Sequence, residues 1–145
     1  MNPPIRTLAD KLAMLEAVCD GTVDMIATDH APHSAEEKSK GLADSMMGVV
    51  GLETAFPALW TGLVKTGLVP IETLISALSD NPRRRFGYPI GKDFSIWNLD
   101  VEKIVDPNEF LSMGRSTPFA GQTLYGENLL TVADGKIVYV KHTNA

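Results

Sequence analysis

Residues 25–33 read Met25-Ile26-Ala27-Thr28-Asp29-His30-Ala31-Pro32-His33, a short apolar run that ends in an aspartate, two histidines and a proline. Strands of α/β proteins end in this way where backbone pairing stops and side chains face a crevice. Asp29 supplies a carboxylate that can bind a metal ion or accept a proton, and two of the three histidines of the chain lie beside it. The stretch therefore predicts a buried strand over 23–28 that leads into a functional site.

The sequence on either side of this strand predicts a helix before it and a loop after it. Apolar residues recur at helical spacing over 8–18, between Thr7, which favours a helix N-cap, and Gly21, which favours a helix end. A helix followed closely by a buried strand is typical of a βαβ unit. The polar stretch over 31–48 predicts a long loop at the carboxyl end of the strand, where α/β enzymes place binding residues.

Further helices are predicted downstream. One helix covers 51–65, and Pro57 inside it indicates a kink or a late start. Another begins at Pro70, and a short helical turn over 81–87 has Asn81 as its predicted cap. These patterns indicate an α/β organisation for the first part of the chain.

The second part of the chain is rich in predicted strands. Residues 94–99 alternate as a strand does, and residues 129–132 and 137–140 flank an Asp134-Gly135 pair that favours a hairpin turn. A lone parallel strand needs neighbours on both sides, and about four short strands are few for a closed sandwich or barrel. We therefore expect the chain to form part of a larger fold, with exposed strand edges that favour self-association.

Composition and charge narrow the classes of function. The chain has 145 residues, 44% of them hydrophobic, which is ordinary for a globular protein. A net charge of −5 argues against a nucleic-acid surface, and the run Arg83–Arg85 is expected to complement a helix C-terminus. The single cysteine, Cys19, excludes an internal disulfide and is expected to be buried in its helix. No apolar stretch is long enough for a membrane span and the start is not a signal peptide, so we expect a cytoplasmic protein.

Three ordered motifs resemble those of the bacterial-type dihydroorotases, members of the metal-dependent amidohydrolase superfamily. They are Asn2-Pro3-Pro4-Ile5-Arg6, Ile26-Ala27-Thr28-Asp29-His30-Ala31-Pro32-His33 and Gly48-Val49-Val50-Gly51-Leu52-Glu53-Thr54. Later residues fit the same family: Asn81-Pro82, Thr117-Pro118-Phe119 and Asp134-Gly135-Lys136. The resemblance covers essentially the whole chain but only about the last third of a full-length enzyme. Three motifs in order, with matching spacing, make the resemblance specific.

The resemblance implies an α/β fold class and a two-part organisation. Residues 1–87 would be the C-terminal part of a (β/α)8 amidohydrolase barrel, namely its last strand and helices. Residues 88–145 would then be the C-terminal part of a small β-sandwich. In this fold the predicted strand over 23–28 is the eighth barrel strand, and Asp29 lies at its C-terminal tip.

The resemblance also implies a reaction and a set of site residues. The enzyme would be a zinc-dependent cyclic amide hydrolase that interconverts N-carbamoyl-L-aspartate and dihydroorotate in pyrimidine biosynthesis, with one or two zinc ions in the parent protein. Asp29 would ligate the zinc and act as general acid and base. Asn2 and His33 would contact the substrate, and the backbone around Met47 and Gly48 would hydrogen-bond the pyrimidine ring.

The other metal ligands of the family have no counterpart in this sequence. They are a His-x-His pair, a carboxylated lysine or an aspartate, and two further histidines, all of which precede the strand that carries Asp29. One carboxylate and a nearby histidine cannot assemble a catalytic zinc site, which needs three protein ligands. We therefore expect the isolated chain to lack both zinc and activity.

Alternatives remain at the level of the function and of single residues. The chain could be a non-catalytic dihydroorotase-like assembly partner of aspartate transcarbamoylase, or part of a related cyclic-amide hydrolase such as an allantoinase or hydantoinase. Asp29 could instead cap the next turn. His30 could belong to the site or hydrogen-bond the loop, and His142 is expected to be solvated.

Overall fold

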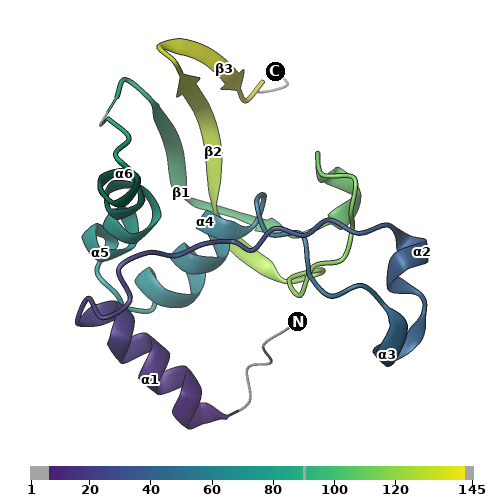
Figure 1. The fold of residues 1–145 in the computed structure, drawn as a ribbon. Coiled ribbons are helices and arrows are strands. Elements are labelled where there is room, and N and C mark those ends of the chain that lie inside the picture. The colour runs from purple at the N-terminus through teal and green to yellow at the C-terminus, as the bar shows by residue number, and fades with distance from the viewer. Residues whose placement is uncertain (1–6, 90, 143–145) are drawn as a thin grey trace.

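The structure is a computed structural model that describes residues 7–89 and 91–142. Its first half is helical with a long extended connection, and its second half forms a three-stranded antiparallel sheet (Figure 1). The elements are α1 (Leu8–Cys19), α2 (Ala35–Lys38), α3 (Gly41–Asp44), α4 (Ala55–Leu59), η1 (Trp60–Val64), α5 (Ile71–Ile75), η2 (Ser76–Asp80), α6 (Asn81–Phe86), β1 (Phe94–Ile104), η3 (Pro107–Glu109), β2 (Thr123–Ala133) and β3 (Lys136–Val140).

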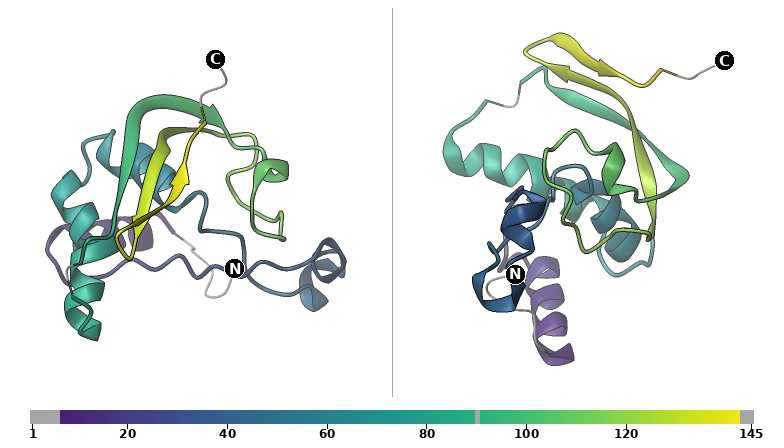
Figure 2. Two further views of the ribbon diagram at one scale, coloured as in Figure 1. Left: turned by 90° about the horizontal axis from the view of Figure 1, so that it is seen from above. Right: turned by 90° about the vertical axis from the view of Figure 1, so that its right-hand side faces the viewer.

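Helix α1 confirms the helix predicted near the N-terminus. The Thr7 hydroxyl accepts the Asp10 N–H at 3.1 Å and the Asp10 carboxylate accepts the Thr7 N–H at 3.0 Å, which completes a capping box. No residue of α1 is buried, and the helix projects from the rest of the molecule (Figure 2). The prediction that Cys19 is buried is wrong: the residue is exposed, although its Sγ lies 3.5 Å from the Leu68 carbonyl oxygen.

The helices over 55–86 follow the predicted pattern with one correction. Helix α4 starts late, at Ala55, so that Pro57 lies in the first turn, where the missing N–H leaves no gap in the hydrogen bonding. Asn81 does not cap a new helix, because the helix runs on from η2 into α6 without a break. Its side chain instead donates to the Asp24 carbonyl at 2.7 Å. Gly87, in the left-handed region with φ of 71°, ends α6 as predicted.

The strand predicted over 23–28 is extended but does not form part of a sheet. The Ile26 N–H donates to the carbonyl of Ala77, on η2, at 3.0 Å. Further along, His30 and Val49 form a single parallel bridge. A parallel strand needs flanking strands, and the described residues provide none beside this segment. The segment therefore crosses the molecule alone, with α1 at one end and α2 and α3 at the other (Figure 1).

The sheet has the order β1-β2-β3, with both pairs antiparallel. Asp134 and Gly135 have φ values of 52° and 69°, as a tight hairpin turn between β2 and β3 requires. The predicted hairpin is confirmed. About four short strands were expected after residue 88, and the described residues form three, because β1 and β2 are both 11 residues long.

The sheet packs on the helices through aromatic side chains. The Phe56 and Trp97 rings lie 4.5 Å apart between centroids, and the Trp60 indole N–H donates to the Leu99 carbonyl at 3.1 Å. The buried apolar residues come from the first half of the chain and from β2. They are Val50, Val69, Leu74, Ala77, Leu124 and Val132.

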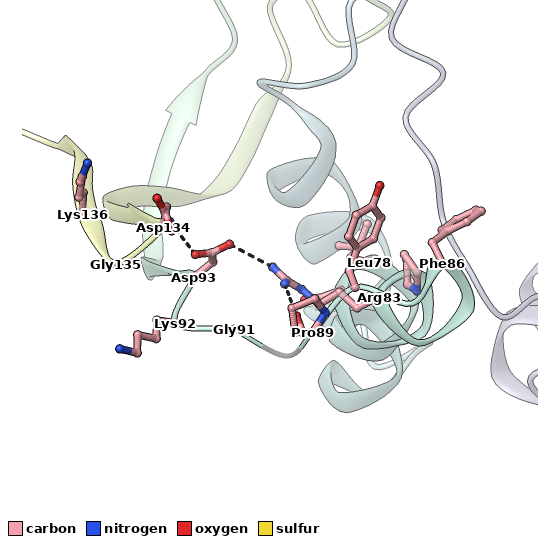
Figure 3. A pocket seen from close by; sticks show the side chains of 13 residues that line it. Leu78, Arg83, Phe86, Pro89, Gly91, Lys92, Asp93, Asp134, Gly135 and Lys136 are labelled. Atoms are coloured by element: carbon pink, nitrogen blue, oxygen red, sulfur yellow. Dashed lines mark hydrogen bonds and ion pairs between the residues drawn. The ribbon is translucent and has the colours of Figure 1, made fainter.

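A polar contact joins the end of α6 to the β2–β3 hairpin (Figure 3). Arg83 donates to the Pro89 carbonyl at 3.1 Å and lies 3.9 Å from the Asp93 carboxylate, which accepts the Asp134 N–H at 2.8 Å. Arg83 thus serves the helix C-terminus, as expected for this basic run. These residues line an open cavity of about 1070 Å³, and the predicted site residues that the structure describes are not among its lining residues.

The molecule exposes an unusually large surface. Its accessible area is 10245 Å², whereas a folded monomer of 15.7 kDa has about 7,300 Å². Large apolar side chains are exposed on α1, on the edge strand β3 and on the loop after η3: Leu8, Leu12, Met14, Leu111, Met113, Ile137, Val138 and Tyr139. Within the described ranges, no helix has the length and apolar character needed to span a bilayer.

We predict that the 145-residue chain self-associates. An unpaired apolar edge strand and exposed apolar helix faces lower their free energy by finding a partner. Light scattering coupled to size-exclusion chromatography should give an average mass that rises with protein concentration. A constant monomeric mass up to high concentration would contradict the prediction.

Candidate functional site

Three segments that are distant in sequence meet at the end of the extended connection. They are 28–33, 48–53 and 112–116. The Ala31 N–H donates to the Val49 carbonyl at 2.9 Å, and the Val50 N–H donates to the Ser116 carbonyl at 2.8 Å. The middle segment therefore joins the predicted site stretch to a loop that precedes β2.

Glycines allow these backbones to touch. A Cβ atom added to Gly48 would lie 2.4 Å from the Ala31 Cβ, and Gly48 has a φ of 121°, which other residues avoid. A Cβ added to Gly114 would lie 2.9 Å from the Pro32 Cα. The close packing of the three segments thus depends on the absence of side chains at these positions.

Asp29 lies exposed at the tip of the extended segment, in an unusual backbone conformation. Its φ is 46°, and among the described residues Asp134 is the other non-glycine residue with a positive φ. Aspartate tolerates this left-handed region better than most residues do. Its carboxylate accepts no hydrogen bond from the described residues, so the turn-capping alternative is not supported there. The carboxylate is available to bind or to transfer a proton.

His30 hydrogen-bonds the neighbouring loops. Its Nδ1 accepts the N–H groups of Gly51 and Leu52, at 3.1 and 3.3 Å, so Nδ1 carries no proton and Nε2 does. Nε2 faces the Ser112 hydroxyl at 3.5 Å. Of the two alternatives for this histidine, the structure supports the one in which it fixes the loop. His30 thereby connects all three segments next to Asp29.

Glu53 is a site residue that our sequence analysis did not single out. Its Oε1 accepts the Ser112 N–H at 2.8 Å, while its Oε2 is buried without a partner among the described residues. Burial by itself raises the pKa of Glu53, but hydrogen bonds from Ser112 and its own backbone lower the pKa overall. Its place in the third sequence motif was the available signal.

We predict that Glu53 stabilises the fold in a pH-dependent way. Because its pKa is lowered in the folded chain, its contribution is complete above the ordinary value of 4.5 and is lost as the pH falls below it. Thermal unfolding of Glu53→Gln should show a deficit at pH 7 that shrinks as the pH falls through the lowered pKa of Glu53. The exposed Glu72→Gln is the matched control and should follow the wild type at every pH. A deficit of the same size for Glu53→Gln at every pH would contradict a contribution from the ionised carboxylate.

His33, Met47 and Gly48 come together, as the sequence predicted. The His33 Nε2–H donates to the Met47 carbonyl at 2.9 Å, and its Nδ1 lies 3.7 Å from the Glu37 carboxylate. The imidazole thus orders the loop on the far side of the site from His30. Asn2, the remaining predicted site residue, lies outside the described residues.

The described residues do not by themselves form a metal site. They contain no group of three histidine, cysteine, aspartate or glutamate side chains close enough to hold an ion. The Nδ1 of His30 and the Nε2 of His33 are engaged by backbone groups, which leaves Asp29 as the open ligand of the predicted set. A catalytic zinc site needs three protein ligands. This chain could therefore supply at most part of such a site.

Comparison with known sequences shows that the chain is similar to proteins named dihydroorotase. The dihydroorotase of Bacillus thuringiensis (strain Al Hakam) is 45% identical over 150 residues, which cover 99% of this chain and 35% of that protein. The chain therefore spans about a third of the length of the curated relatives it matches. No protein-family model matches it.

Solved structures agree on the fold. The L-hydantoinase of Arthrobacter aurescens superposes with a TM-score of 0.88 at 29% identity, over 99% of this chain and 34% of that one. An inactive dihydroorotase-like domain of a CAD-like multifunctional protein from Chaetomium thermophilum gives a TM-score of 0.68 at 24% identity, over 92% and 36% of the two chains. The predicted fold class is confirmed: an α/β portion of the amidohydrolase fold that ends in a piece of antiparallel sheet.

Proposed function

Because this chain is related in sequence to the dihydroorotases over nearly its whole length, we propose that it forms part of an enzyme that hydrolyses and closes cyclic amides. Its substrate pair is dihydroorotate and N-carbamoyl-L-aspartate, in the cytoplasm. Residues 1–87 belong to the barrel of that enzyme and residues 88–145 to its small β-sandwich. The observation that carries the proposal is the exposed carboxylate of Asp29 at the tip of the extended segment, whose next residues Ala31 and His33 bond Val49 and Met47.

Asp29 moves the proton in the proposed reaction. In hydrolysis, a water molecule adds to the ring amide carbonyl and Asp29 accepts the proton that the water loses. The ring carbon–nitrogen bond then breaks, and Asp29 returns the proton to the departing nitrogen. Asn2 and His33 contact the substrate, and the backbone around Met47 and Gly48 holds the ring.

The metal of the proposed enzyme is zinc, and this chain contributes one ligand, Asp29. The remaining ligands lie outside these 145 residues, since the described residues bring no group of three potential ligands together. The zinc, when bound, would make water nucleophilic near neutral pH. The isolated chain then binds no zinc and turns over no substrate.

A chimera tests the proposed substrate. In it, these 145 residues replace the matching segment of the Bacillus thuringiensis relative, and hydrolysis of dihydroorotate and of hydantoin is compared. We expect dihydroorotate to be the better substrate by kcat/KM. A preference for hydantoin would assign the chain to the hydantoinase-type alternative, for which the Arthrobacter structure is the supporting observation.

The Chaetomium structure supports a second candidate function. In this second candidate function, the present chain is a non-catalytic assembly partner of aspartate transcarbamoylase. This candidate requires that the chimera bind that enzyme in co-sedimentation yet hydrolyse no cyclic amide. Retention of the open Asp29 carboxylate favours the catalytic proposal, because a scaffold does not need it.

A further inference from the structure

Lys38, at the end of α2, reaches back across the loop to the site. Its Nζ donates to the Met46 carbonyl at 2.8 Å and to the Gly48 carbonyl at 3.0 Å. The carbonyl between them, that of Met47, accepts the His33 Nε2–H. Three consecutive carbonyls are thus held by two side chains of the preceding segment.

The short helix α2 orients the Lys38 side chain towards these carbonyls. Ser34 and Glu37 form a capping box, with the Ser34 N–H donating to the Glu37 carboxylate at 2.8 Å and the Glu37 N–H to the Ser34 hydroxyl at 3.1 Å. At the other end the Ser45 hydroxyl donates to the Lys38 carbonyl at 2.9 Å. Hydrogen bonds therefore fix the chain both before and after Lys38.

The arrangement leaves main-chain donors free on the other side of the same peptides. The N–H groups of Met47 and Gly48 have no acceptor within the described part of the chain, whereas the Val49 N–H belongs to the parallel bridge with His30. The two free N–H groups belong to the same peptide groups as the held carbonyls of Met46 and Met47. Bonding of a carbonyl to a cation or an imidazole polarises its peptide group and makes the N–H a stronger donor.

We propose that Lys38 is a positioning residue for substrate binding. It holds the backbone over 46–48 so that the N–H groups of Met47 and Gly48 meet the carbonyl and carboxylate oxygens of the cyclic amide substrate. This inference rests on the proposed function. A lysine suits the task because one ammonium group offers three donors and can bond two carbonyls at once.

Hydrogen exchange and kinetics on the chimera test the proposal. Lys38→Met should speed exchange of the hydrogen-bonded Met46 and Val50 amides, which flank the held carbonyls, by about tenfold or more, because both charge-assisted bonds are lost. It should also raise KM for dihydroorotate by about tenfold while kcat falls much less. Lys38→Arg should recover part of both effects. Lys40→Met is the matched control, since Lys40 is exposed in the same loop and makes no hydrogen bond there, and it should change neither quantity.

The outcomes separate this inference from the proposed function. Unchanged exchange of the Met46 and Val50 amides in Lys38→Met would show that Lys38 does not hold this backbone. Faster exchange with an unchanged KM, or a loss confined to kcat, would overturn its role in substrate binding. If the wild-type chimera hydrolyses no cyclic amide, the proposed function and the substrate role fail together, while the exchange measurement still decides whether Lys38 holds the loop.

Discussion

Replacing Asp29 by asparagine should lower dihydroorotate turnover by the chimera by about three orders of magnitude. Asparagine has the shape of aspartate but cannot accept and return a proton, and it is a weaker metal ligand. The fold should survive, because asparagine also tolerates the left-handed conformation that Asp29 adopts at φ of 46°. Steady-state kinetics and circular dichroism of the same samples measure both effects.

The chain offers a matched control for this change. Asp134 also has a positive φ, 52°, but lies in the hairpin turn between β2 and β3. Asp134→Asn should therefore leave both turnover and folding close to wild type. If Asp29→Asn retains wild-type rates, or if the two variants lose activity equally, Asp29 has no special role in the reaction.

Gly48→Ala should disrupt the site through the backbone. The new Cβ would lie 2.4 Å from the Ala31 Cβ, and alanine is strained at φ of 121°. Overpacking and backbone strain together should cost about 3 kcal/mol of unfolding free energy. The contact with Ala31 would open, so turnover by the chimera should fall with stability. Urea unfolding and steady-state kinetics measure the two losses.

Two other glycines separate the causes of that loss. Gly62, in η1, has no atom within 4 Å of an added Cβ and no positive φ, so Gly62→Ala should be neutral or stabilising by about 0.5 kcal/mol. Gly121 has a φ of 74° with open space around it, so Gly121→Ala should cost about 1 kcal/mol from strain alone. A Gly48→Ala variant no less stable than Gly121→Ala would show that Gly48 and Ala31 do not pack closely.

Features encoded by neighbouring residues were predictable from the sequence. The Thr7 cap of α1, the end of α6 at Gly87 and the Asp134-Gly135 hairpin each depend on the dihedral preferences or hydrogen bonds of a few adjacent residues. The position of Asp29 at the end of an extended segment was also predicted. The pattern over 23–28 indicated a strand, but a strand is completed by its neighbours, and the described residues provide none.

Features that depend on distant partners were not predictable. The sequence could not show that Asn81 would bond Asp24 instead of capping a helix, nor that Cys19 would be exposed. Of the candidate site, His33 and Gly48 were singled out through the motifs that contain them, and Met47 as the residue next to Gly48. The bond from Glu53 to Ser112 spans 59 residues of sequence, and no local pattern encodes it. Lys38 looked like an ordinary solvated charge until its two carbonyl partners were visible.

The most direct test asks whether the Asp29 carboxylate works only together with ligands from the remainder of the enzyme. Dihydroorotate hydrolysis and bound zinc should be measured for the 145-residue polypeptide by itself, and after mixing with the Bacillus relative from which the matching segment has been deleted. Neither polypeptide should bind stoichiometric zinc or turn over substrate separately, and the mixture should recover both properties unless Asp29 is changed to asparagine. Zinc binding with turnover by the 145 residues unaided would contradict the account.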